Sequence, residues 1–310
     1  MEKYYITTPI YYVNDKPHIG HAYTTILADT ISRFRALIGE KPTFLTGLDE
    51  HGLKVQQAAE KNGKAPQDHC DSMAPAFIDL WKKLNINYSD FIRTTEHRHT
   101  KIVQQILTKV HESGDIYMDE YEGWYSISEE RFITEKELDS GQFGEVKQIK
   151  EKNYFFRMSK YQATLIDKIE KDELLIQPKS RKNEVLGFLK NELSDLCISR
   201  PKSRLEWGIE LPFDDNYVTY VWFDALINYI SAIGAYSNDE HFSSLWPADV
   251  HLIGKDILTT HSVYWPTMLL SLGLPLPQRI FAHGWWLTDD QKMSKSLGNV
   301  VSPLMLIDDF

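Results

Sequence analysis

The chain of 310 residues, 42% hydrophobic and 12% aromatic, is long enough for roughly two globular domains, and no stretch approaches the ~18 consecutive apolar residues of a membrane-spanning helix. Its formal net charge of −10 repels polyanions at long range, so nucleic acid could bind only at local basic patches. Two cysteines, Cys70 and Cys197, are too few for a disulfide framework or a thiolate zinc site, and without a visible secretion signal the sequence indicates a soluble, cytoplasmic protein with no membrane partner.

Strands and helices alternate in the first third of the chain, as is typical of α/β folds. Residues 4–13 are rich in β-branched and aromatic side chains and predict a strand, and apolar residues at helical spacing predict a helix over 18–38 that Gly39 ends. The alternation continues with strands at 42–48 and 91–94 and helices at 51–61, 66–84 and 97–113. Residues 1–116 are therefore predicted to be the first half of a nucleotide-binding catalytic domain.

The alternation stops at about Tyr117, where polar, aromatic, hairpin-like sequence begins. We expect residues 117–212 to form an inserted α+β connective domain, with helical stretches near 160–171 and 183–193. Strands at 217–221 and 250–253 and helices at 223–233 and 257–272 then make 213–310 the second half of the catalytic domain. The predicted fold class is α/β, a doubly wound, Rossmann-like parallel sheet split by an insertion.

The string His18-Ile19-Gly20-His21 lies where the first strand gives way to the first helix. That junction is at the carboxyl end of the sheet, where such folds bind nucleotides. Free backbone N–H groups favour phosphate there, Gly20 lets a nucleotide approach the backbone, and both imidazoles lie on one helix face, from which they can donate hydrogen bonds to phosphates. Taken alone, the pair fits equally well with two solvent-facing histidines at the start of a helix.

A second motif, Lys292-Met293-Ser294-Lys295-Ser296, is followed by Leu297-Gly298-Asn299. The ammonium groups of Lys292 and Lys295 can neutralise the negative charge that accumulates as pyrophosphate leaves a triphosphate. Two lysines in a polar loop are usually just a solvated loop. Their occurrence with the histidine motif, in the other half of a split fold, favours one shared triphosphate site.

Together the two motifs resemble the signatures of the class I aminoacyl-tRNA synthetases. That family's ribose-binding Gly-x-Asp is matched by Gly254-Lys255-Asp256, although Asp256 alone would more simply be a helix N-cap. The resemblance implies ATP binding by His18, Gly20, His21, Gly254, Asp256, Lys292 and Lys295, and it makes His18, His21, Lys292 and Lys295 the catalytic residues.

Four further segments, 8–12, 47–52, 221–229 and 257–265, look like those of methionyl-tRNA synthetases, and the resemblance covers essentially the whole chain. It implies that Asp49 holds the α-amino group of methionine. It also implies a methionine site lined by Ile10, Tyr12, Trp222, Ala225, Leu226, Tyr229, Ile257, His261 and Trp265.

The chemistry of these residues agrees with a methionine site. A carboxylate and a substrate ammonium form a charge-assisted bond, and a thioether makes favourable contacts with aromatic rings. From the residues alone, Asp49 could instead be a helix N-cap. The helical spacing of Trp222, Ala225 and Tyr229 is more often that of plain core.

Two departures from the family pattern affect the expectations. Many members carry Cys-x-x-Cys knuckles in the insertion, but Ser126 and Glu129 stand where the cysteines would be, so we expect no zinc and no other protein-bound metal site. The chain also ends at Phe310, shortly after the lysine motif, where members continue into an anticodon-binding domain. We therefore expect a fragment of a longer protein.

The resemblance implies activation of methionine by ATP with Mg²⁺, and transfer of the methionyl group to tRNA(Met). Basic residues in or near the insertion could contact the acceptor end of tRNA, although such runs are more often solvated faces. They are Lys179, Arg181, Lys182, Arg200, Lys202 and Arg204. Two alternatives stay open: a related nucleotidyltransferase that adenylylates a small molecule without tRNA, and a non-catalytic tRNA-binding relative.

Overall fold

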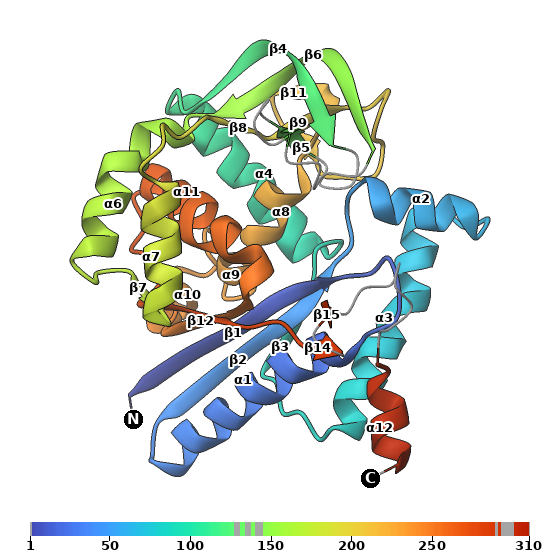
Figure 1. Cartoon of the computed structure of the whole chain (residues 1–310), viewed down its shortest axis with the longest axis vertical. Coiled ribbons are helices and arrows are strands. Elements are labelled where there is room, and N and C mark those ends of the chain that lie inside the picture. Colours follow the sequence, from blue (N-terminus) through green and yellow to red (C-terminus); the bar gives the residue numbers. More distant parts are fainter. Residues whose placement is uncertain are drawn as a thin grey trace.

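A parallel sheet forms the centre of the computed structural model, which describes residues 2–126, 131–133, 138–139, 145–288, 291–292 and 301–309 (Figure 1). The strand order is β3-β2-β1-β12-β13-β7, and every neighbouring pair is parallel. The strands are β1 (Lys3–Tyr12), β2 (Lys41–Asp49), β3 (Asp90–Arg93), β7 (Leu175–Gln177), β12 (Val250–Gly254) and β13 (Arg279–His283). The predicted doubly wound fold is confirmed.

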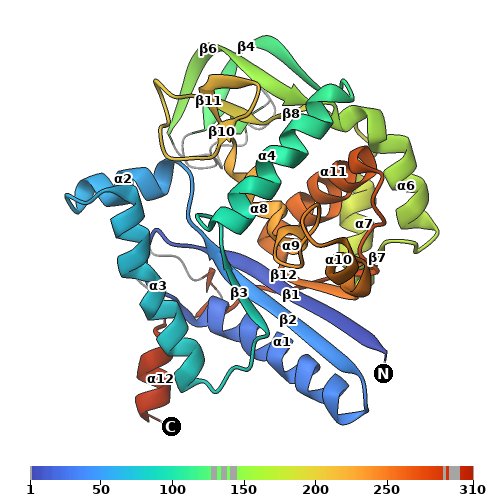
Figure 2. The same ribbon diagram turned by 180° about the vertical axis from the view of Figure 1, so that it is seen from behind.

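Helices cover both faces of this sheet, with α1 (Ile19–Leu37) on one face (Figures 1 and 2). The opposite face is covered by α4 (His97–Glu112), α8 (Val221–Leu226), α9 (Asn228–Ser231) and α11 (Trp265–Leu272). Because side chains alternate along a strand, Tyr4 and Ile6 of β1 pack into the core on the α1 side, whereas Tyr5 packs into the core with α4. Both faces are therefore buried, as a parallel sheet requires.

The described residues of the insertion form two antiparallel sheets. One is made of β4 (Ile116–Ser126), β5 (Arg131–Ile133), β6 (Val146–Phe156) and β8 (Leu196–Cys197), and the other of β9 (Ser199–Pro201), β10 (Glu210–Leu211) and β11 (Asp214–Thr219). Its helical parts include η1 (Met158–Tyr161), α6 (Gln162–Glu170) and α7 (Lys179–Phe188).

Two strands differ in their pairing from what the alternation suggested. β7 lies inside the stretch expected to be the insertion, yet it pairs with β13 at the edge of the central sheet. β11 corresponds to the strand expected at 217–221, but it pairs with β9 and β10 and not with the central sheet. The sequence could not show either pairing, because short strands carry no local signal of their partners. The domain boundaries at 116 and 212 stay a prediction.

The remaining elements are α2 (Leu53–Lys61), α3 (Pro66–Lys83), α10 (Asp239–Leu245), η2 (Lys255–Ile257), η3 (Thr260–Tyr264), β14 (Leu287–Thr288), β15 (Gln291–Lys292) and α12 (Pro303–Asp309). The helix expected over 257–272 begins as a 3₁₀ turn, continues as the π-helix η3 and ends as α11. The last helix, α12, lies beside α3 (Figures 1 and 2). Within the described parts of the chain, no helix has the length and apolar character needed to cross a bilayer.

The carboxyl ends of four parallel strands meet at one edge of the sheet. β1 ends at Tyr12, β2 at Asp49, β12 at Gly254 and β13 at His283. The ladder between β1 and β12 consists of Ile6 with Val250 and Thr7 with His251, after which β1 continues through Pro9, a residue without an N–H to donate. Because the strand order reverses between β1 and β12, this edge is where an open α/β sheet binds its ligand.

Candidate active site

A cavity of about 520 Å³ opens at that edge of the sheet, between the two halves of the chain. Most residues expected for ATP and methionine line it together. From the ATP set they are His18, Gly20, His21, Gly254 and Asp256, and from the methionine set Ile10, Tyr12, Asp49, Trp222, Ala225, Leu226, Tyr229, Ile257 and His261. One volume therefore unites residues that are more than 200 positions apart in the sequence.

Three predicted site residues are not among those that line the cavity. Trp265 is fully buried behind Tyr229, with 5.8 Å between the ring centroids. The backbone of Lys292 pairs with Leu287, which follows the cavity residue Trp286. Lys295 lies outside the described residues. The roles of all three stay predictions.

Both histidines of the first motif cap the start of α1. His18 is the N-cap residue, and its Nδ1 accepts the N–H of Gly20 at 3.1 Å. The Nδ1 of His21 accepts the N–H of His18 at 3.2 Å, which completes a capping box built from two imidazoles. A ring nitrogen that accepts a hydrogen bond carries no proton, so in the neutral rings the proton is on Nε2. Each neutral ring is therefore a hydrogen-bond donor at Nε2.

Gly20 has a role in this cap that the sequence did not reveal. A Cβ atom at Gly20 would lie 2.9 Å from Cε1 of His18 and 3.1 Å from its Nδ1. The missing side chain therefore makes room for the imidazole that folds back over the helix start. Close approach of a nucleotide, the reason inferred from the sequence, stays a prediction.

The described residues on both sides of Lys295 reach the cavity region. Before it, β15 places the backbone of Lys292 beside Leu287, next to the cavity wall. After it, the carbonyl oxygen of Val301 accepts the N–H of Ile19 at 3.2 Å. Because Ile19 is the residue between His18 and Gly20, the far end of the chain is hydrogen-bonded to the histidine motif itself.

The buried end of the cavity contains a tyrosine and a histidine that bond to each other. The Tyr229 hydroxyl and His261 Nε2 are 2.7 Å apart, and His261 Nδ1 lies 2.9 Å from the carbonyl oxygen of Ile257. A carbonyl can only accept, so Nδ1 carries the proton and Nε2 accepts the hydrogen bond of Tyr229. Burial lowers the pKa of His261 to about 4, which keeps the ring neutral. The ring projects from the π-helix η3, a distortion frequent at functional sites.

A second buried histidine lies beneath this pair. His251 Nδ1 is 2.8 Å from the hydroxyl of Thr7, and its Nε2 accepts the indole N–H of Trp265 at 3.2 Å. Burial lowers the pKa of His251 well below its usual value, so this ring is neutral too. Trp265 thus packs behind Tyr229, which forms the floor of the cavity with His261. An aromatic floor without charge suits a thioether, whose sulfur favours contact with rings.

The helix-cap interpretations left open for two aspartates do not hold. Asp256 lies inside η2, whose N-cap residue is Gly254, and Asp256 is exposed at the cavity. Asp49 ends β2 and is 5% exposed, whereas the N-cap residue of α2 is Gly52. Both carboxylates therefore line the cavity, Asp49 at the end of β2 and Asp256 two residues after the end of β12.

Several cavity residues were not singled out from the sequence. His283 lies 2.7 Å through its Nε2 from the hydroxyl of Thr24, and the ammonium group of Lys255 lies 3.7 Å from the ring centre of Trp285. His283 ends β13, so the rule that ligands bind at the carboxyl ends of strands could have found it. The others are Pro9, Tyr11, Asn14, Lys54, Val221, Asn228, Gly284 and Trp286.

The basic residues proposed for tRNA are mostly engaged within the chain. Arg200 is 4% exposed, and its guanidinium lies over the rings of Tyr125 and Tyr220, so it is not part of a solvated face. Arg181, Lys182, Lys202 and Arg204 each pair with a carboxylate.

Metal ligands do not gather in the described residues, which contain no cluster of three or more His, Cys, Asp or Glu side chains suited to an ion. Ser126, at one expected knuckle position, is a buried residue at the end of β4. Glu129, at the other, lies outside the described residues. The expectation of no zinc stays a prediction.

A split parallel sheet with a histidine pair at its carboxyl edge is the fold of the class I aminoacyl-tRNA synthetases. The family model described as tRNA synthetases class I (M) matches residues 4–142 and 139–310. The chain belongs to the methionyl-tRNA synthetase family.

Its relatives include the methionine–tRNA ligase of Clostridium tetani, 52% identical over 99% of this chain, and that of Bacillus subtilis, 49% identical over 98%. The chain spans 48% of the length of each. A solved structure of Mycobacterium tuberculosis methionyl-tRNA synthetase in complex with methionyl-adenylate matches all of this chain with 42% identity and a TM-score of 0.95. This chain covers 62% of that one. The free-state structure of that enzyme matches less closely, with a TM-score of 0.76 and 40% identity over 92% of this chain and 56% of its own.

Proposed function

We infer that this chain carries out amino-acid activation, in which methionine and ATP form methionyl-adenylate and pyrophosphate. The observation that carries the proposal is one cavity that joins two imidazole Nε2–H donors, a carboxylate and an uncharged aromatic floor. The match to a solved structure of a relative in complex with methionyl-adenylate supports the same reaction.

In the proposed reaction, a carboxylate oxygen of methionine attacks the α-phosphorus of ATP. The bond from that phosphorus to the oxygen bridging to the β-phosphate breaks, and pyrophosphate leaves with both electrons of the bond. The Nε2–H groups of His18 and His21 stabilise the charge on the phosphate oxygens, and Lys292 and Lys295 neutralise the leaving pyrophosphate. Mg²⁺ arrives on the phosphates of ATP as part of the substrate. Most of the rate enhancement then comes from positioning and charge stabilisation.

Methionine would lie with its ammonium group at Asp49 and its thioether on the floor formed by Tyr229 and His261. The ammonium gains a charge-assisted bond to a carboxylate that is 5% exposed, where water competes little. The neutral rings of the floor offer no charge to a side chain, so an acidic or basic amino acid would lose its hydration without compensation. Asp256 and Gly254 would hold the ribose of ATP.

Transfer of the methionyl group to the acceptor end of tRNA(Met) would follow, and it is supported by membership of the family. Cytoplasmic placement is supported by Cys70 and Cys197, which are both free thiols.

The experiment is ATP–pyrophosphate exchange, measured with this chain and each of the amino acids in turn. Methionine alone should support rapid exchange, and Lys295→Ala should slow it by roughly 100-fold because charge stabilisation at the leaving group is lost. Exchange that depends on a small molecule other than an amino acid would favour the small-molecule nucleotidyltransferase. No exchange with any amino acid or other small molecule would favour the non-catalytic relative. An unchanged rate in Lys295→Ala would remove that lysine from the mechanism.

A further inference from the structure

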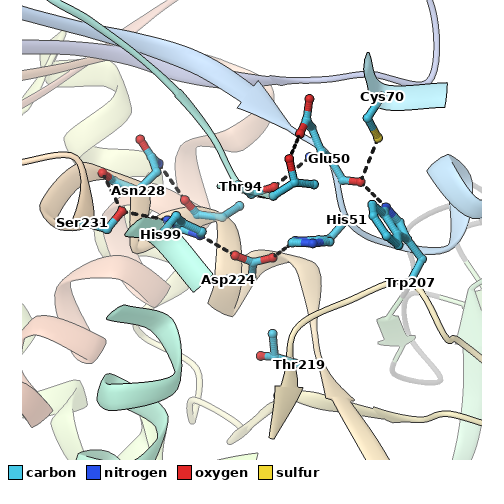
Figure 3. A network of polar contacts seen from close by, with 12 residues as sticks. Glu50, His51, Cys70, Thr94, His99, Trp207, Thr219, Asp224, Asn228 and Ser231 are labelled. Atoms are coloured by element: carbon cyan, nitrogen blue, oxygen red, sulfur yellow. Dashed lines mark hydrogen bonds and ion pairs between the residues drawn. The ribbon is translucent and has the colours of Figure 1, made fainter. Parts of the chain in front are cut away.

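A buried aspartate lies between two histidines behind the cavity (Figure 3). Asp224 of α8 is fully buried, and its Oδ2 is 2.6 Å from Nδ1 of His51 while its Oδ1 is 2.6 Å from Nε2 of His99. Its two partners come from the loop after β2 and from α4. Three segments that are distant in the sequence therefore meet at one carboxylate.

Asp224 is held in its ionised form. Burial acts to raise its pKa, but the charges and hydrogen bonds of His51 and His99 outweigh burial and hold the pKa below its usual value. A carboxylate only accepts, so each imidazole donates an N–H to one of its oxygens. His99 continues the chain of bonds, since its Nδ1 lies 2.7 Å from the hydroxyl of Ser231 in α9.

The position of Asp224 connects the two walls of the cavity. In α8 it sits between Trp222 and Ala225, which line the apolar wall, but its own side chain is not exposed there. His51 follows two residues after Asp49, the carboxylate proposed to hold the ammonium group of methionine. The His51–Asp224 bond therefore links the end of β2, where Asp49 lies, directly to α8, which forms the apolar wall.

The loop that carries His51 is fixed on its other sides as well. Glu50 is fully buried and accepts the Nε–H of Arg93 at 2.7 Å, and its backbone oxygen accepts the indole N–H of Trp207 (Figure 3). Gly52 has a φ of 106°, a conformation that L side chains rarely adopt. With the loop anchored to β3 and the insertion, the bond to Asp224 sets where α8 lies relative to it.

We propose that Asp224 is a positioning residue for methionine: its paired bonds to His51 and His99 fix the apolar wall of the cavity relative to Asp49. The proposal rests on the proposed function, because it assigns the two walls to the side chain and the ammonium group of one amino acid. Second-layer groups of this kind hold contacting residues in register, and errors of about 1 Å in such sites reduce binding or rate substantially.

The first test compares Asp224→Asn with Asp115→Asn. Asp115 is a matched control, since it is 2% exposed, bonds to Lys160 Nζ at 2.6 Å and to the hydroxyl of Ser271 at 2.8 Å, and does not line the cavity. Both variants should lower the unfolding midpoint. Asp224→Asn alone should raise the KM for methionine about tenfold, with the KM for ATP unchanged and kcat reduced less than KM is raised.

A second test uses the geometry of the two histidine contacts. Asn places a donor where Nδ1 of histidine lies, and Gln places one where Nε2 lies. His51→Asn and His99→Gln should therefore keep the KM for methionine close to that of the unsubstituted chain, whereas His51→Gln and His99→Asn should raise it. These four variants show whether the bonds to Asp224 position methionine even if Asp224→Asn does not fold.

The outcomes separate this proposal from the proposed function. Methionine-dependent exchange by the unsubstituted chain, combined with an unchanged methionine KM in Asp224→Asn or equal effects of the two substitutions at His51, would overturn the positioning role alone. Absence of methionine-dependent exchange in the unsubstituted chain would overturn the proposed function, and the positioning role with it.

Discussion

Histidines stand at both ends of the cavity, and the two ends hold them in opposite tautomers. At the start of α1, Nδ1 of His18 and of His21 accepts a backbone N–H, so the proton of each neutral ring is on Nε2. At the floor, Nδ1 of His261 donates to the carbonyl of Ile257, so its Nε2 is an acceptor. The same side chain therefore presents a donor to one ligand group and an acceptor to another.

The difference follows from the backbone group that each ring meets. The first turn of a helix has unsatisfied N–H groups, whereas a ring that folds back onto the preceding turn meets a carbonyl oxygen. A donor is what a phosphate requires, and a neutral acceptor that fixes the Tyr229 hydroxyl is what an uncharged floor requires. Secondary structure has thus set which nitrogen of each imidazole carries the proton.

The largest expected effect is a loss of stability at low pH, caused by the neutral His261 at the floor of the cavity. His261 has a pKa of about 4 in the folded chain and 6.5 as its ordinary value, so between these pH values the unfolded chain binds a proton that the folded chain does not. The free energy of unfolding should therefore fall by about 3 kcal/mol as the pH drops across this window. His251, whose pKa is shifted in the same direction, should add to the loss.

Urea unfolding across that pH range checks the prediction. His261→Gln keeps an acceptor for Tyr229 but cannot titrate, so its stability should depend less steeply on pH. Identical pH profiles for the variant and the unsubstituted chain would mean that His261 is not the group responsible.

His18 has two roles, as the N-cap of α1 and as the Nε2–H donor proposed for phosphate, and one substitution can separate them. His18→Asn keeps a side-chain oxygen to accept the N–H of Gly20, since asparagine is a preferred N-cap residue, but it loses the Nε2–H donor. ATP–pyrophosphate exchange should fall about 100-fold, while the unfolding midpoint stays nearly constant. His18→Ala should lose both. If His18→Asn retained full exchange, the donor assigned to Nε2 would play no part in the reaction.

The smallest expected effect concerns the hydroxyl of Tyr229. Tyr229→Phe leaves the buried Nε2 of His261 without the donor that it has now, and the KM for methionine should rise about tenfold with the KM for ATP unchanged. Tyr154→Phe is the control, because the Tyr154 hydroxyl bonds to Asp214 of β11 at 3.0 Å and Tyr154 does not line the cavity. Equal methionine KM values in the two variants would contradict the role given to the floor.

Sequence patterns predicted β1, β2, β3 and β12 of the central sheet and the position of His18, His21 and Asp49 at its carboxyl edge, because alternation and strand ends are local signals. They missed β7 and β13. They could not place Trp265 behind Tyr229, since helical spacing gives the face of a residue but not its depth. The pairing of β7 with β13 and the burial of Arg200 between two tyrosines also depend on distant contacts. The bond from His51 to Asp224 joins residues 173 positions apart, and no spacing rule indicates it.

The central claim is that imidazoles from the front of the chain and ammonium groups from its far end act on one triphosphate. The direct measurement is a crystal structure with methionine and an ATP analogue that cannot be cleaved at the α-phosphate. We predict phosphate oxygens within about 3 Å of Nε2 of His18 and His21, with the Lys295 ammonium on the same triphosphate. A triphosphate bound away from these rings, or Lys295 on a separate surface, would contradict the account.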